Sequence, residues 1–311
     1  MHFNGTKAYN DYGSFIRGHF GERVQKISLD TGFTCPNRDG TKGTGGCSYC
    51  NNNTFNPDYC KPGVSISEQL DKGISFFSQK RGTRKFLAYF QAYTNTYADT
   101  ELLKSLYLDA LAHPGVEGLV IGTRPDCVSE QLLAFLSELS RDRFICLEFG
   151  VESTLNRTLE TVNRCHTYEE TVAAYERARD RGIYLGAHLI LGLPGETREE
   201  MLAHADAVSA LPIRFLKLHQ LQVVKHTRMA VDLQRHPEDF ALFELEDYLE
   251  LVTEFVARLR SDIIIERFIS ESPANLLLAP RWGLKNFEIV ARIDRLLEAK
   301  ESWQGKNFTA S

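Results

Sequence analysis

The chain has 311 residues, of which 43% are hydrophobic and 25% are charged, and its formal net charge is −5. This composition is ordinary for a globular protein with a sizeable core, and the acidic balance excludes a uniformly basic nucleic-acid-coating protein while leaving a local basic groove possible. No run reaches the roughly 18 apolar residues that span a bilayer, and the first residues lack a signal-peptide pattern, so we expect a cytoplasmic protein without a membrane partner.

Short apolar runs with strand character alternate with longer segments of helical periodicity through most of the chain. Six β-then-α units with short joints predict a parallel sheet with helices outside it. With right-handed crossovers, three architectures are compatible with this pattern: a barrel, a partial barrel and a doubly wound sheet. In each of them the functional site lies at the carboxyl ends of the strands. The expected strands are 26–30, 85–93, 116–122, 144–151, 184–192 and 214–223, and the expected helices are 65–80, 99–112, 129–140, segments up to 181, and 197–210.

The regular alternation of strand and helix patterns ends after residue 224. A long amphipathic helix over 239–260 is expected there, followed by a strand over 262–268 and a final helix over 284–300 after a loop over 272–283. No flexible linker separates this part from the rest. We therefore interpret residues 225–311 as an extension packed on a core of residues 1–224, which includes a long loop over 31–62.

Seven cysteines are present, and four of them fall within the loop over 31–62. An odd number in a long chain without an export signal makes a disulfide framework improbable. Cys47 and Cys50 form a C-x-x-C pair that can place two thiolates on one metal centre, and eleven residues separate Cys35 from Cys47 in a glycine-rich stretch. Thiolates suit zinc or iron–sulfur clusters.

Three interpretations of this loop compete. A structural zinc site would take Cys60 as its fourth ligand and would make the protein a zinc-stapled binding module without catalysis. A thioredoxin-type redox pair is disfavoured because three asparagines, rather than a helix, follow Cys50. Three cysteines in a glycine-rich loop after the first strand of a βα array favour the third interpretation, an iron–sulfur cluster with one iron free of protein ligands.

The cysteine spacing, eleven residues and then two, together with the segment 32–40, resembles the radical SAM superfamily in the variant of the YhcC-type proteins. These are similar to the branch that holds the Elongator catalytic subunit and the oxygen-independent coproporphyrinogen oxidases. The segments 150–153, 162–164 and 188–196 resemble motifs of the branch's fourth and fifth strands. The resemblance implies an α/β fold: a partial (β/α)6 TIM-type barrel with a C-terminal α/β extension.

The resemblance also implies the cofactors. Cys35, Cys47 and Cys50 would ligate three irons of a 4Fe–4S cluster, and the fourth iron would bind S-adenosylmethionine. One electron, from a reductase, flavodoxin or ferredoxin, would cleave the sulfonium to a 5′-deoxyadenosyl radical that abstracts hydrogen from a substrate. Relatives modify tRNA wobble uridines or tetrapyrroles, so the resemblance favours a tRNA nucleoside or another bulky substrate. A cluster-free methyltransferase is disfavoured because no G-x-G-x-G turn follows a strand.

By the same resemblance, side chains at the strand ends would contact S-adenosylmethionine. Arg164 matches an arginine that pairs with the cofactor carboxylate, and His188 sits where relatives often carry an aspartate against the ribose. Glu152 takes a position usually held by glutamine, and Thr94 and Asn95 stand where relatives carry two glycines. The further candidates are Thr123, and Tyr49 and Leu191, whose backbone groups would approach the adenine.

Two polar residues of the sixth expected strand form a separate pair. Alternation places Lys217 and His219 on one face of that strand. If this face lines the barrel lumen, both are candidates for substrate contact or proton transfer. The alternative is a solvated strand edge.

Overall fold

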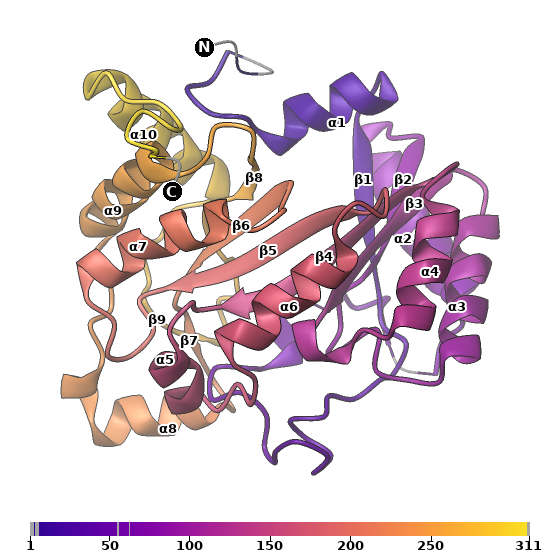
Figure 1. The fold of residues 1–311 in the computed structure, drawn as a ribbon, viewed down its shortest axis with the longest axis horizontal. Coiled ribbons are helices and arrows are strands. Elements are labelled where there is room, and N and C mark those ends of the chain that lie inside the picture. Colours follow the sequence, from indigo (N-terminus) through magenta and orange to yellow (C-terminus); the bar gives the residue numbers. More distant parts are fainter. Residues whose placement is uncertain (1–2, 4–5, 55, 62, 310–311) are drawn as a thin grey trace.

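The computed structural model describes residues 3, 6–54, 56–61 and 63–309, so residues 55 and 62 of the predicted loop and residues 310–311 of the predicted extension lie outside the description. One curled sheet forms the centre of the molecule (Figure 1). Its strands are β1 (Val24–Leu29), β2 (Lys85–Phe90), β3 (Val116–Thr123), β4 (Phe144–Glu152), β5 (Tyr184–Leu191), β6 (Phe215–Gln220) and β8 (Ile264–Arg267).

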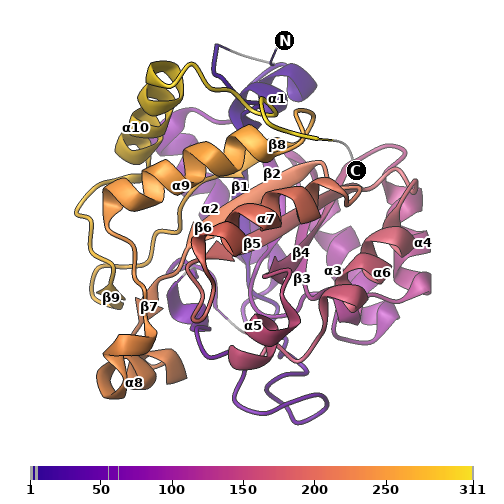
Figure 2. The same ribbon diagram turned by 60° about the vertical axis from the view of Figure 1, so that its left-hand side comes forward.

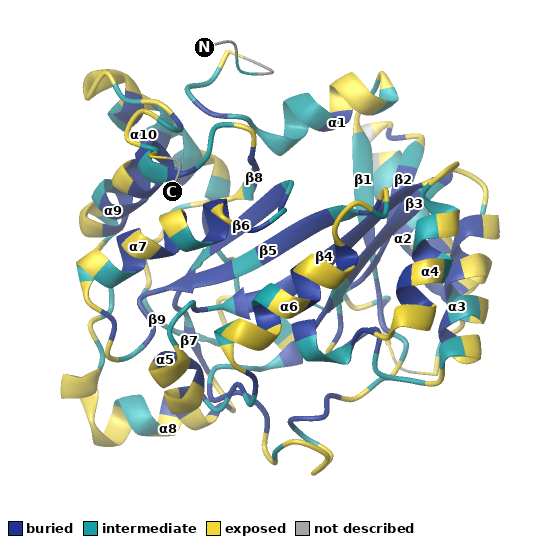
Figure 3. Cartoon of the chain, in the orientation of Figure 1, coloured by how far each residue is buried: buried dark blue, intermediate teal, exposed yellow. Residues whose placement is uncertain are grey.

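Every neighbouring pair in this sheet is parallel, in the order β1-β2-β3-β4-β5-β6-β8. Helices cover its outer face (Figures 1 and 3). The core helices are α1 (Tyr12–Phe20), α2 (Ile66–Arg81), α3 (Thr100–Ala112), α4 (Glu130–Leu139), α5 (Asn156–Thr161), α6 (Tyr168–Ala178) and α7 (Arg198–Ser209). The predicted fold class, a partial TIM-type barrel, is confirmed.

Local sequence accounts for these elements. The central strands carry near-continuous apolar runs because both of their faces are covered, as in other parallel sheets. Thr167 with Glu170 and Thr197 with Glu200 form capping boxes that start α6 and α7. Apolar residues of the helices and the outward strand residues build the main core around Leu147.

Helix α1, which the sequence analysis did not predict, closes the amino end of the half-barrel. Ile16 packs with Leu87, Phe144 and Phe215, which lie in the first half of their strands, and Phe15 packs against the same group. These side chains fill the amino end of the lumen. The carboxyl ends of the strands therefore form the open side, where parallel α/β folds place their sites.

The extension adds helices α8 (Arg228–Arg235), α9 (Leu245–Arg258) and α10 (Asn286–Ala299), and a two-stranded sheet of β7 (Val223–Val224) and β9 (Leu277–Ala279). Helix α9 contacts α7 and α10 (Figure 2). The helix expected over 239–260 is wrong at its start, because a 3₁₀ turn at Pro237–Asp239 and a coil precede α9. Among the described residues, no helix combines the length and apolarity needed to cross a bilayer.

Strand β8 crosses the boundary expected at residue 224, because it pairs with β6 as the seventh strand of the main sheet. Its outer edge is covered by the N-terminal segment, where the amide of Ile265 donates to the carbonyl of Asn10 at 2.8 Å. The fully buried Gln304 accepts from the amide of Asn10 at 2.9 Å and donates to the carbonyl of Ile263 at 2.7 Å. The extension is thus built into the barrel and shapes its lumen.

Candidate functional site

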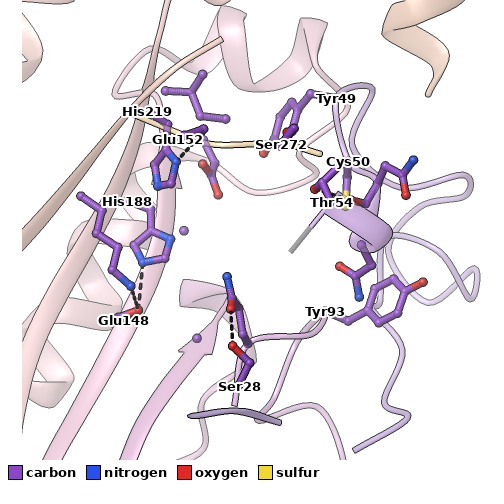
Figure 4. A pocket seen from close by; sticks show the side chains of 18 of the residues that line it. Ser28, Tyr49, Cys50, Thr54, Tyr93, Glu148, Glu152, His188, His219 and Ser272 are labelled. Carbon is purple, nitrogen blue, oxygen red and sulfur yellow. Dashed lines mark hydrogen bonds and ion pairs between the residues drawn. The ribbon is translucent and has the colours of Figure 1, made fainter. Parts of the chain in front are cut away.

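A pocket of about 450 Å³ opens at the carboxyl ends of the strands. The predicted cysteines of the loop line one part of it, and side chains of β4, β5, β6 and β8 line another. Figure 4 shows His188 and His219 on one side of this space and Tyr49, Cys50 and Tyr93 on the other. The pocket is therefore the place where residues far apart in the sequence meet.

The three predicted cluster ligands, Cys35, Cys47 and Cys50, all line the pocket as free thiols. Burial and the neighbouring Cys47 raise the pKa of Cys50 to about 11, while the nearby Arg38 opposes that rise. Within the described ranges, no three His, Cys, Asp or Glu side chains converge as one metal ion requires. A 4Fe–4S cluster instead distributes its cysteines over separate irons, so its ligands border a common space.

Hydrogen bonds to backbone groups fix the shape of the cysteine loop. The buried Asn37 amide donates to Cys47 Sγ at 3.6 Å and to the carbonyl of Asn163. The Asn163 side chain in turn donates to the Gly46 carbonyl at 2.9 Å, and the Ser48 amide donates to the Val162 carbonyl at 2.9 Å. The loop is thereby tied to the segment that follows α5.

Arg164 lies in this segment and is buried at the pocket wall. Its Nη2 donates to the Gly150 carbonyl at 2.7 Å and lies 3.5 Å from Glu152 Oε1, and its Nη1 lies 3.6 Å from Cys47 Sγ. The register of β4 with β5 shifts between Gly150 and Glu152, and Glu152 takes a left-handed φ of 67°. Such a bulge re-aims a side chain, and here it directs the carboxylate toward Arg164.

Polar atoms at this wall show that a polar ligand fits. The Tyr49 hydroxyl and Arg164 Nε are buried and have no hydrogen-bond partner among the residues described. Buried polar groups without partners are costly, so such a pair next to three free thiols is typical of a ligand site. The residues present therefore fit a cluster held by cysteines beside a bound molecule with polar groups.

Six of the predicted cofactor contacts line the pocket: Tyr49, Thr94, Thr123, Glu152, Arg164 and His188.

The other two predicted contacts, Asn95 and Leu191, are not brought to the pocket. Asn95 donates from its amide to the carbonyls of Phe90 at 3.0 Å and Gly122 at 2.9 Å, so it braces the ends of β2 and β3. The side chain of Leu191 is fully buried in the helix-side core, which leaves the expected contact of its backbone with the adenine untested.

An ion network forms the floor of the pocket. Glu148, which is 1% exposed, accepts from Lys217 at 2.6 Å, from Lys26 at 3.0 Å and from His188 at 3.0 Å. Glu266 of β8 accepts from Lys26 at 2.7 Å and lies 3.2 Å from Lys217. Burial alone would raise the pKa of Glu148, but the two lysines and the histidine hold it well below its usual range. Lys217 thus faces the lumen and not a solvated edge.

His219 lies on the same face of β6, as strand alternation predicts. Its Nδ1 shares a hydrogen with the Ser270 hydroxyl, and its buried Nε2 has no partner in the described part of the chain. Burial, together with the charges of His188, Arg267 and Lys217, holds the pKa of His219 well below its usual range. The imidazole is therefore neutral at physiological pH.

Sequence reasoning missed Lys26, Glu148 and Glu266, which complete the floor. Glu148 could have been found, because it interrupts an apolar strand and a buried carboxylate must have a cationic partner. The sequence does not name that partner, since Lys26 stands 122 residues away.

The structure does not favour the alternative in which Cys60 completes a zinc site. Cys60 is 3% exposed and does not line the pocket that the other three cysteines share. Burial and the Asp30 carboxylate raise the pKa of its thiol to about 12.

Comparisons with known proteins point to one superfamily. Residues 35–208 match the model of the Radical SAM superfamily, and residues 213–299 match that of the Radical_SAM C-terminal domain. The chain is 36% identical over 296 residues to protein YhcC of Escherichia coli (strain K12), covering 94% of this chain and 93% of that protein. It is 33% identical over 312 residues to the uncharacterized protein YtqA of Bacillus subtilis (strain 168), covering 98% and 94%.

Among solved structures, the fold is similar to archaeal Elp3 of Methanocaldococcus infernus with an N-terminal deletion. The TM-score is 0.68 at 18% identity, and the match covers 90% of this chain and 64% of that one. At this level of identity the likeness concerns the fold alone.

Proposed function

Because this chain belongs to the radical SAM superfamily and is a radical SAM enzyme, we propose that it cleaves S-adenosylmethionine reductively at a 4Fe–4S cluster held by Cys35, Cys47 and Cys50. The observation that carries this proposal is the position of the three free thiols around one pocket, beside buried polar atoms that have no partner in the described part of the chain. When bound, the cluster and S-adenosylmethionine supply a 5′-deoxyadenosyl radical that takes hydrogen from a C–H bond of the substrate.

The chain's own residues orient the cofactor. Arg164 Nε and the Tyr49 hydroxyl are free to donate, Arg164 toward the methionyl carboxylate, and Glu152 can accept from the methionyl amino group. His188 is bound through Nε2 to Glu148, which leaves Nδ1 for a ribose hydroxyl. The hydroxyls of Thr94 and Thr123 border the same space and supply further polar contacts.

On the substrate side we assign different roles to Lys217 and His219. Lys217 donates to Tyr89 and Glu148 and forms an ion pair with Glu266, so it positions the floor. His219 is neutral and its Nε2 has no partner among the residues that the structure describes, so it is available to bind the substrate or to exchange a proton with it.

We also propose the setting of the reaction. A tRNA nucleoside, or another bulky molecule, is the substrate that the resemblance to the Elongator branch supports, while the net charge of −5 lends it no support. A cytoplasmic reductase, flavodoxin or ferredoxin would supply the electron. A comparison of tRNA nucleosides from cells with and without the gene tests this assignment, and unchanged nucleosides would remove tRNA from consideration.

The experiment for the proposed chemistry is anaerobic reconstitution followed by iron and product analysis. The wild-type chain is expected to bind about four irons and to release 5′-deoxyadenosine with dithionite and S-adenosylmethionine. Cys47→Ala should abolish both. Cys60→Ala and Cys127→Ala should retain both, because neither side chain lines the pocket. A colourless wild-type protein with one zinc, lost on Cys60→Ala, would overturn the proposal.

A further inference from the structure

The pairing of β6 with β8 contains a register shift that changes which side chains enter the lumen. Leu216 pairs with Ile265, but Lys217 pairs with Arg267, so Glu266 is an extra residue. Residues that pair across neighbouring strands point to the same face, and Lys217 faces the lumen. Glu266 also reaches the lumen, because its carboxylate binds Lys26. The bulge therefore directs the Glu266 carboxylate and the Arg267 guanidinium, which are adjacent in sequence, toward the same pocket.

Arg267 differs from the other cations that line the pocket. Lys26 and Lys217 bind carboxylates, Arg38 and Arg164 donate to backbone carbonyls, and Arg124 pairs with Asp126. Arg267 has no hydrogen bond and no ion pair within the ranges that the structure describes, although it lines the pocket. Its positive charge nevertheless acts inside the lumen, where it contributes to lowering the pKa of His219 and of Lys217.

A rigid strap, residues 270–272, holds the surroundings of Arg267 in place. Gln220 accepts from the Ser270 amide at 2.7 Å and donates to its carbonyl at 3.2 Å, and Gln222 accepts from the Ser272 hydroxyl at 2.7 Å. Glu271, the acidic residue of the strap, accepts from the Asn286 amide at 2.9 Å. These bonds fix Ser270 against His219 Nδ1 and leave the buried Nε2 without a partner on this part of the chain.

We propose that Arg267 and His219 form an oxyanion subsite that binds a phosphate or carboxylate group of the substrate. A guanidinium offers parallel donors that match the oxygens of such a group, and the imidazole adds a further donor in the tautomer in which Nδ1 accepts from Ser270 and Nε2 carries the hydrogen. The floor lysines are already neutralised by Glu148 and Glu266, so Arg267 is the cation of this wall that has no ion pair among the described residues, and the exposed carboxylate of Glu271 borders the same pocket. This assignment rests on the proposed function, because the same pocket must present the substrate to the radical.

The test measures anion binding to the full chain without its cluster. Calorimetric titrations with inorganic phosphate and with acetate are run at one pH and one ionic strength, since screening would otherwise mask the difference. We expect one site on the wild type, at least tenfold weaker binding by Arg267→Ala, and an intermediate loss by Arg267→Lys. Arg235→Ala, which removes an exposed arginine of the same extension, should bind within twofold of the wild type.

The two anions distinguish the substrate classes, because tighter phosphate binding indicates a phosphate ester and tighter acetate binding a carboxylate. Equal affinity of the wild type and Arg267→Ala, or no binding by the wild type, overturns the subsite. Melting temperatures of the variants identify misfolding, and His219→Asn provides a second variant at the same subsite. Loss of phosphate binding in both would support the assignment.

A methionine competition separates this subsite from the cofactor carboxylate. If methionine displaces phosphate and itself fails to bind Arg267→Ala, the guanidinium serves the cofactor and the proposal is overturned. Independent binding of the two supports it. Because these titrations need no cluster, a failure to form 5′-deoxyadenosine would contradict the proposed function and leave the anion result standing.

Discussion

The two walls of the pocket are held in different ways. The cluster wall, residues 35–50 and 162–166, is fixed by hydrogen bonds between side chains and backbone groups, such as those of Asn37 and Asn163. The extension wall, formed by β6, β8 and 270–272, carries a network of charges that neutralise one another. Arg267 and the buried Nε2 of His219 lie beside this network and have no partner among the described residues. A wall fixed by backbone bonds keeps one shape for one chemistry, whereas a wall of side-chain charges can be altered to suit a substrate.

The largest effect should come from the floor of the extension wall. Lys217→Met removes one of the two lysines that pair with the buried Glu148 carboxylate. Because breaking a buried ion pair leaves a charge without its partner, we expect the free energy of unfolding to fall by about 3 kcal/mol. Urea unfolding measures the loss. The double variant Lys217→Met/Glu148→Gln should lose less than the sum of the single variants, because the buried charge has gone with its partner. A single-variant loss below about 1 kcal/mol would contradict the account of the floor.

The cluster wall should be destabilised by an added methyl group at Gly43. In Gly43→Ala the added Cβ would lie 2.3 Å from Asn37 Oδ1 and 2.8 Å from Cys165 Sγ, so Asn37 must leave Cys47. We expect a loss of about 2 kcal/mol and incomplete iron uptake after reconstitution. Gly18→Ala in α1, which meets nothing within 4 Å, is the control and should gain about 0.5 kcal/mol. Full iron content in Gly43→Ala would show that the loop is not rigid.

His166, a residue of the cluster wall, makes the free energy of unfolding depend on pH. Burial and the charge of Arg164 lower the pKa of His166 to about 3. Because the folded-state pKa lies below that of the unfolded chain, the stability is complete above about pH 6.5 and declines as the pH falls toward 3. Between pH 7 and 5.5 the loss from this residue should be about 1 kcal/mol, and His166→Gln should show a correspondingly shallower decline in urea unfolding. Parallel curves for the two proteins would refute this origin.

The smallest effect concerns the strap. Ser272→Ala removes the hydrogen bond to Gln222 and should cost about 0.5 kcal/mol. Iron content and uncoupled 5′-deoxyadenosine release should stay unchanged, since the strap belongs to the extension wall. If iron uptake fell, the two walls would be coupled, and the division between them would not hold.

The sequence predicted what depends on local patterns. Cys35, Cys47 and Cys50 are close in the chain and their spacing carries the motif, so their convergence on one pocket was foreseeable. Helix α1 could also have been found, because Asp11 caps its start and Gly21 its end. The floor of the pocket could not be predicted, because Lys26 and Glu266 stand 240 residues apart in the sequence and meet through the curl of the sheet.

The bulge in β8 was equally hidden, because alternation in a regular strand would send Arg267 away from the lumen if Glu266 faced it. It has a consequence for reading related sequences. A homologue that lacks one residue at Glu266 would keep a seventh strand but lose either the carboxylate or the guanidinium from its lumen. A one-residue gap at this point of an alignment would therefore mark homologues whose lumen carries a different charge, even where the three cysteines are identical.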